Sequence, residues 1–190
     1  IINFDTNYSF DDGLKFMGII KELFVYKNIN PYITFKELYK IIPVSLHINT
    51  TIVNNKTCKI YNHIDTPDFM VANAIYASMS IPFFIKPIII DGDVHIDGSI
   101  INDFPLEYAK NIDENYSNIL CFKSINKNQE NKIKSIFKKK YDTNFNNYLG
   151  EYINLIIGTL MKNNFIHEKF DDNIINVDFH EIDLFDYEYT

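Results

Sequence analysis

Residues 81–99, IPFFIKPIIIDGDVHIDGS, decide the fold. Two short apolar runs flank Asp91-Gly92, and an Asp-Gly pair between such runs is a strong signal for a two-residue β-hairpin. The second run ends at Asp97, and Gly98 follows it. Because glycine adopts backbone angles that are closed to other residues, we expect Gly98 to turn the chain sharply just after the acid. The stretch therefore predicts an antiparallel strand pair with a carboxylate at its end.

Helices and strands alternate on both sides of this hairpin. Apolar spacing predicts a helix over 12–27 with Asp11 or Asp12 as N-cap, and Thr34 with Glu37 has the spacing of a capping box for a helix over 35–41. The remaining predicted elements are strands 44–53, 58–61, 118–123 and 174–179, helices 67–78, 105–111 and 148–161, and a loop over 99–104. This alternation favours an α/β fold.

Composition and charge exclude several classes of protein. All 18 basic residues of the 190 are lysine, so the bidentate guanidinium that usually reads phosphate or guanine is absent, and at a net charge of −7 we expect no nucleic-acid partner. The charge of −7 comes from the acidic tail 171–190, which we interpret as solvated. No apolar stretch is long enough to cross a membrane, so the expected location is cytoplasmic or peripheral at a membrane. Cys58 and Cys121 are expected to be buried, reduced thiols.

Asp97 is the leading candidate for chemistry because it follows a strand, at the rim where α/β proteins place their sites. The alternative is structural: Asp97 caps the turn that follows it. His95 is expected to be a partly exposed strand residue rather than a member of a triad. The remaining histidines lack ligand-like spacing, so no metal site is predicted. Phe83 and Phe84 are candidates for core residues or for the lining of an acyl-chain pocket.

Four motifs follow one another in the chain: Ala77-Ser78-x-x-Ile81-Pro82, the Asp91-Gly92 hairpin, Asp97-Gly98-Ser99 and Asn102-Asp103-Phe104-Pro105. This succession resembles the C-terminal half of a patatin-like phospholipase domain. The resemblance extends over roughly residues 10–123. It implies a three-layer α/β/α sandwich and a lipid acyl hydrolase that uses a Ser–Asp dyad, with no cofactor. By position in the D-G-[GAS] motif formed by Asp97, Gly98 and Ser99, Asp97 matches the dyad base. A serine hydroxyl is a poor nucleophile until such a base takes its proton.

One element of the family pattern is missing. None of the eight serines lies in a G-x-S-x-G elbow, and the six glycines form no Gly-rich oxyanion loop. Asp103 also stands where the family usually has Asn. We therefore expect a domain truncated at its N-terminus, with residues 1–123 as its C-terminal portion, 124–147 as a polar Lys/Asn-rich insert and 148–190 as a terminal helix, strand and acidic tail. Such a segment would contain the base but not the nucleophile, so we expect it to be inactive alone. In the intact protein, the expected partner is a lipid or membrane surface. A non-catalytic patatin-derived binding module or pseudoenzyme is the alternative.

Overall fold

The computed structural model describes residues 9–112, 119–125 and 174–178. The chain forms two compact units, which are described separately: in the described residues, the first covers 9–103 and the second covers 104–112, 119–125 and 174–178. The predicted helix 148–161, most of the polar insert and of the acidic tail, and the first eight residues lie outside the described residues. The boundaries expected for these regions therefore stay predictions.

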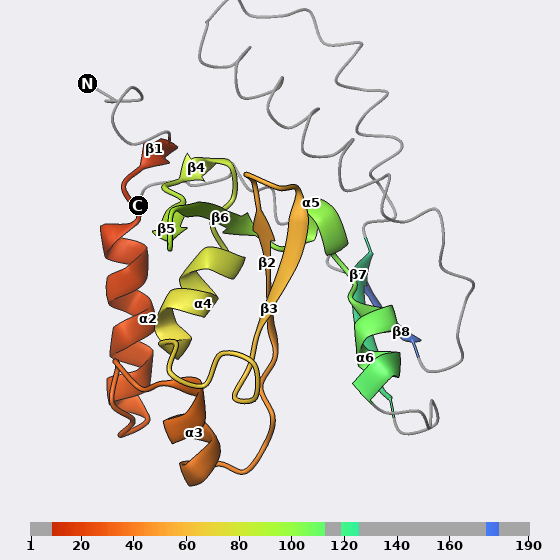
Figure 1. Cartoon of the computed structure of the whole chain (residues 1–190), viewed down its shortest axis with the longest axis horizontal. Coiled ribbons are helices and arrows are strands. Elements are labelled where there is room, and N and C mark those ends of the chain that lie inside the picture. Colours follow the sequence, from red (N-terminus) through yellow and green to blue (C-terminus); the bar gives the residue numbers. More distant parts are fainter. Residues whose placement is uncertain (1–8, 113–118, 126–173, 179–190) are drawn as a thin grey trace, which may run out of the picture. The chain divides into compact units, whose positions relative to one another are not determined.

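The centre of the first unit is a four-stranded antiparallel sheet in the order β3-β2-β6-β5 (Figure 1). The hairpin predicted at Asp91-Gly92 is confirmed: β5 (Ile88–Ile90) pairs with β6 (Asp93–Asp97), and Ile90 lies opposite Asp93. Both turn residues have positive φ, 53° at Asp91 and 89° at Gly92, as a two-residue hairpin with the twist of a sheet requires. The hairpin thus fixes where β6 ends.

The other two strands form a second hairpin, β2 (Ile48–Ile52) with β3 (Thr57–Tyr61). β2 begins at Ile48 rather than at the predicted Val44, because Ile48 pairs with Tyr61 and β3 ends there. The residues before Ile48 have no strand partner, and Val44 is 68% exposed. The link between α3 (Phe35–Ile41) and β2 therefore runs along the surface.

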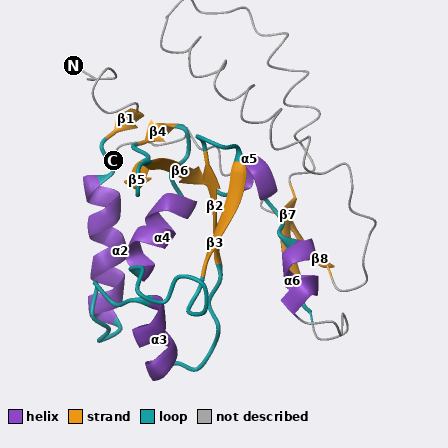
Figure 2. Ribbon diagram, viewed as in Figure 1, coloured by secondary structure: helices purple, strands orange, loops and turns teal. Residues whose placement is uncertain are grey.

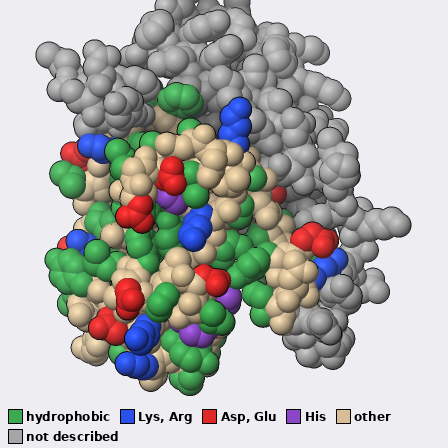
Figure 3. All heavy atoms as spheres, viewed as in Figure 1, with side chains coloured by type: hydrophobic (Ala, Val, Ile, Leu, Met, Phe, Trp, Pro, Cys, Tyr) green, Lys and Arg blue, Asp and Glu red, His purple; other side chains and the backbone are tan. Residues whose placement is uncertain are grey.

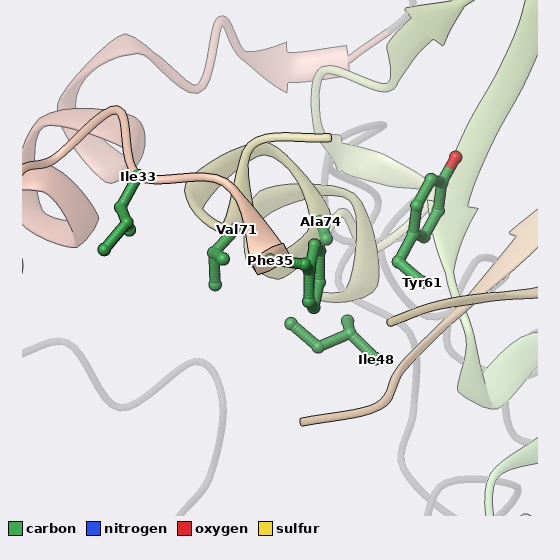
Figure 4. Close-up of a cluster of buried hydrophobic side chains, with 6 residues drawn as sticks. All are labelled: Ile33, Phe35, Ile48, Tyr61, Val71 and Ala74. Atoms are coloured by element: carbon green, nitrogen blue, oxygen red, sulfur yellow. The ribbon is translucent and has the colours of Figure 1, made fainter. Parts of the chain in front are cut away.

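Helix α4 (Val71–Ser78) packs against β2 and β6, and α2 (Leu14–Tyr26) packs against α4 (Figure 2). Ala72, Ala74 and Ala77 of α4 are buried, so small side chains permit a close approach to the sheet. Figure 4 shows the core where these elements meet, with the Phe35 ring of α3 among residues of β2 and α4. Its six members are Ile33, Phe35, Ile48, Tyr61, Val71 and Ala74.

The helix ends differ in how well the sequence predicts them. The capping box is confirmed: Thr34 Oγ1 accepts from the Glu37 amide, and Glu37 Oε2 accepts from the Thr34 amide. For α2 the N-cap is Gly13, with φ 74°, and not Asp11 or Asp12. α4 begins at Val71 rather than at 67, because Met70 is extended and pairs with Thr34. That pairing ties the start of α4 to the cap of α3.

A parallel pair of short strands, β1 (Ser9–Asp11) and β4 (Phe83–Ile85), completes the first unit. The second unit contains α6 (Leu106–Ile112) and the parallel pair β7 (Cys121–Ile125) and β8 (Ile174–Asp178). Cys58 and Cys121 are thiols that form no disulfide, but both are partly exposed rather than buried. The described elements confirm a mixed α/β architecture.

Candidate active site

Asp97 is the last residue of β6, opposite Thr50 of β2. Its amide donates to Ser80 O at 3.0 Å, which ties the strand end to the segment after α4. Asp97 is partly exposed at this end of the strand. The structure thus places the predicted acid at a strand end with a fixed backbone.

One oxygen of this carboxylate holds the turn. Asp97 Oδ1 accepts hydrogen bonds from the Ser99 amide at 2.9 Å and from Ser99 Oγ at 2.7 Å. This is the Asx-type turn that the structural alternative describes. Among the hydrogen bonds of the described residues, none reaches Oδ2. The turn therefore uses one oxygen of the carboxylate, Oδ1.

The residues after Asp97 are not the loop that the sequence predicts. Ser99–Asn102 form a short helix, α5, and the Asn102 amide donates to Gly98 O at 3.0 Å. The amide of Ser99, one of those at the start of a helix that have no partner within the helix, donates to Asp97 Oδ1.

Gly98 is required for a reason other than the predicted one. Its φ is −66° and its ψ −27°, which any residue can adopt. A Cβ at this position would instead lie 2.5 Å from the carbonyl oxygen of Asn49 and 2.7 Å from its carbonyl carbon. Gly98 is therefore needed for the close approach of two backbones, because no side-chain atom fits between them.

Asn49 and Thr51 hold this turn from β2, and neither is among the residues that the sequence predicts for the site. Asn49 Nδ2 donates to Asn102 O at 2.6 Å and to Gly98 O at 3.3 Å, and Thr51 Oγ1 donates to Gly98 O at 3.4 Å. The Cys58 thiol donates to Asn49 Oδ1, so both the nitrogen and the oxygen of the Asn49 side-chain amide form hydrogen bonds. The three consecutive polar residues in the middle of β2, Asn49-Thr50-Thr51, are the signal that could have identified them, because the first and third share one face of the strand.

His95 is buried, 3% exposed, and the expectation of a partly exposed strand histidine is wrong. Its Nδ1 lies 3.1 Å from Thr50 Oγ1 and 3.3 Å from the Tyr61 hydroxyl. Burial lowers the pKa of His95, and it raises the pKa of Tyr61 to about 12. Both contacts are to Nδ1: β2, which pairs with β6, supplies the Thr50 hydroxyl, and β3, on the far side of β2, supplies the Tyr61 hydroxyl.

Phe83 and Phe84 lie in β4, which follows the segment bonded to Asp97. Phe83 has φ 70°, a strained backbone for a bulky side chain, and is 39% exposed. The Phe84 ring lies 5.9 Å from that of Phe10. Their assignment to an acyl-chain pocket stays a prediction. In the part of the chain that the structure describes, no three His, Cys, Asp or Glu side chains are placed to hold a metal ion.

A mixed α/β domain with an Asp-Gly-Ser turn at the edge of its sheet is the class that the fold and site define. The sequence model for the patatin-like phospholipase family matches residues 4–110. The chain belongs to this family, and it has the α/β patatin-like fold.

Two viral proteins are similar to this chain. A protein of Invertebrate iridescent virus 6 named "Probable lipid hydrolase 463L" is 28% identical over 117 residues, which is 57% of this chain and 40% of that protein. "Uncharacterized protein R571" of Acanthamoeba polyphaga mimivirus is 26% identical over 103 residues, which is 54% of this chain and 33% of that protein. Each match thus covers less than half the length of these curated relatives.

Proposed function

We propose that this chain supplies the general base of a lipid acyl hydrolase that works by a Ser–Asp dyad, with Asp97 as the base. Membership of the patatin-like phospholipase family supports lipid hydrolysis, and the name of the iridescent virus relative points the same way. The observation that carries the assignment of Asp97 is the geometry of its carboxylate: the turn fixes Oδ1 through Ser99, and Oδ2 is left for a serine proton.

In the proposed reaction, Asp97 Oδ2 is the proton acceptor. A nucleophilic serine gives its proton to Asp97 Oδ2 while its Oγ attacks the ester carbonyl carbon, and the leaving alcohol takes the proton back. Asp97 then accepts a proton from the water that attacks the acyl-serine, and it returns this proton to the serine Oγ as the bond between Oγ and the acyl carbon breaks and the fatty acid leaves. Backbone amides would stabilise the oxyanion, which is typically the largest single effect in such reactions.

The nucleophile belongs to residues outside this chain in our proposal. No serine of the chain stands in the family's G-x-S-x-G elbow. We therefore expect the 190 residues by themselves to release no fatty acid from lipid. We expect the protein to bind its substrate peripherally, at the surface of a lipid aggregate or membrane. In the described ranges, no helix is long and apolar enough to cross a bilayer.

The alternative of a patatin-derived binding module has one observation in its favour, because the bonds from Ser99 already give Asp97 a structural role. Asp97→Asn separates the two functions. Asparagine keeps an Oδ1 acceptor for the turn but cannot take a proton from serine.

The experiment compares fatty-acid release from phospholipid vesicles by this chain joined to the sequence that supplies the elbow serine, with and without Asp97→Asn. We expect a loss on the order of 10²- to 10⁴-fold, the usual contribution of a general base, at unchanged thermal stability. Ser99→Ala is the matched control, because it removes one bond to Oδ1 and leaves the carboxylate. Full activity of Asp97→Asn would refute the proposal.

A further inference from the structure

Three polar side chains meet beside the surface link between α3 and β2: Ser45 and His47 belong to the link, and His63 follows β3. Ser45 Oγ lies 2.7 Å from His47 Nε2 and 3.1 Å from His63 Nδ1. The β2–β3 hairpin brings them together: Ile48 pairs with Tyr61, so the residues just before β2 face those just after β3. Figure 3 shows histidine side chains at the surface of the first unit beside hydrophobic ones.

The hydroxyl of Ser45 has one proton, which restricts how the three groups bond. It can donate to only one imidazole, so the other ring must donate an N–H to Oγ. The shorter contact suits O–H donation to His47 Nε2, and the longer one suits His63 Nδ1–H donation to Oγ. In this arrangement His47 withdraws the proton from Ser45 while His63 stabilises the negative charge that develops on the oxygen.

The charge state of His47 fits a base. Its partial burial lowers its pKa, the neighbouring His63 lowers it further, and Asp65 acts in the opposite direction. A pKa below the usual value keeps the ring neutral at physiological pH, which is the form that accepts a proton.

His63 is held in place from two sides. Its ring stacks on Tyr39 of α3, with ring centroids 3.8 Å apart and planes 11° from parallel. The backbone around it is fixed by Asn62, which is 1% exposed and whose Oδ1 accepts from the amides of Ile64 at 2.8 Å and Asp65 at 2.7 Å. The orientation of the ring toward Ser45 therefore costs little further ordering.

Ser45 itself is exposed, and apolar side chains adjoin the cluster in the sequence: Val44 is 68% exposed and Ile64 is 71% exposed. A small ester can reach Oγ, and exposed apolar surface favours contact with its hydrocarbon part.

We propose that Ser45 is a second nucleophile, separate from the Asp97 site, that accepts the acyl group of small activated carboxylic esters. Ser45 Oγ attacks the carbonyl carbon and its proton passes to His47 Nε2. The bond to the leaving oxygen breaks, and the leaving alcohol takes the proton from His47. The products are acyl-Ser45 and the free alcohol, so the proposal does not require lipid hydrolysis and does not rest on the proposed function.

The test treats the 190-residue chain with 4-nitrophenyl acetate and maps acetyl groups by mass spectrometry of its peptides. The other seven serines are internal references in the same digest. We expect Ser45 to be acetylated on the order of 10²-fold faster than they are, and His47→Gln to remove most of that advantage. His63→Gln should slow Ser45 acetylation less, since it removes the stabilising donor and leaves the base.

Ser78→Ala is the matched control, because Ser78 is partly exposed on α4 and should not alter the labelling of Ser45. Each variant is checked for native circular dichroism before labelling. Equal acetylation of Ser45 and the reference serines in the unmodified chain overturns the proposal, and so does fast labelling of Ser45 that His47→Gln leaves unchanged.

Discussion

Replacing Gly98 by alanine should destabilise the first unit, although its backbone conformation suits alanine. The added Cβ would lie 2.5 Å from Asn49 O, whereas ordinary contacts begin at 3.4 Å. Asn49 is in β2, which is paired with β3 on one side and β6 on the other, so its carbonyl cannot rotate away. The strand or the α5 turn must move instead, and the hydrogen bonds that reach Gly98 O would lengthen.

The size of the effect follows from two opposing contributions. Overpacking a site whose neighbours are backbone atoms costs about 3 kcal/mol, the upper end of the usual range. Alanine at an allowed conformation restricts the unfolded chain and returns about 0.4–1 kcal/mol. We therefore expect Gly98→Ala to lower the free energy of unfolding by about 2 kcal/mol.

The assay is urea unfolding followed by far-ultraviolet circular dichroism, in which a change of this size moves the midpoint by about 1 M. The matched control is Gly18→Ala in the interior of α2, where an added Cβ meets nothing within 4 Å. Alanine should stabilise that helix by about 0.5–1 kcal/mol, so the two substitutions should have opposite signs. A Gly98→Ala protein at least as stable as the unmodified chain would refute the close-approach explanation.

Three further predictions use the same unfolding assay. Thr34→Ala removes the capping box of α3 and should cost about 1 kcal/mol, whereas Thr34→Ser should cost much less; equal values would contradict the cap. Asn49→Ala removes the side-chain donor to Asn102 O and one of the donors to Gly98 O and should cost about 2 kcal/mol, against less than about 0.5 for the exposed Asn55→Ala. Because burial lowers the pKa of His95 below its usual 6.5, the folded chain binds fewer protons than the unfolded one, and stability should fall as pH drops below about 6.5. The His95 contribution cannot exceed about 1.4 kcal/mol per pH unit, and His95→Gln should flatten the dependence; an unchanged slope would contradict it.

The sequence predicts local features well where one short pattern determines them. The Asp91-Gly92 hairpin, the Thr34–Glu37 capping box and the strand that ends at Asp97 all depend on residues within a few positions of one another. The Asx turn was also foreseen as an alternative, because Asp97 and Ser99 are two residues apart. These interactions need no knowledge of the tertiary fold.

The features that the sequence missed depend on pairing between distant segments. The sequence predicts that Gly98 adopts an unusual φ, but it is the approach of Asn49, 49 positions away, that excludes a side chain. His95 is buried because β2 and β3 bring Thr50 and Tyr61 to it. Likewise, no sequence spacing connects Ser45 to His63. In each case the register of the sheet, set by the two hairpins, decides the environment.

The most direct test of Asp97 as the base measures activation of the nucleophile alone. The protein in this experiment joins the chain to the sequence that supplies the elbow serine. It is treated with a fluorophosphonate, and the rate at which the reagent covalently labels that serine is followed in a single turnover. If Asp97 takes the serine proton, Asp97→Asn slows labelling on the order of 10²-fold or more, while Ser99→Ala stays within a few-fold of the unmodified protein. Labelling of Asp97→Asn at the unmodified rate would show that Asp97 only holds the turn.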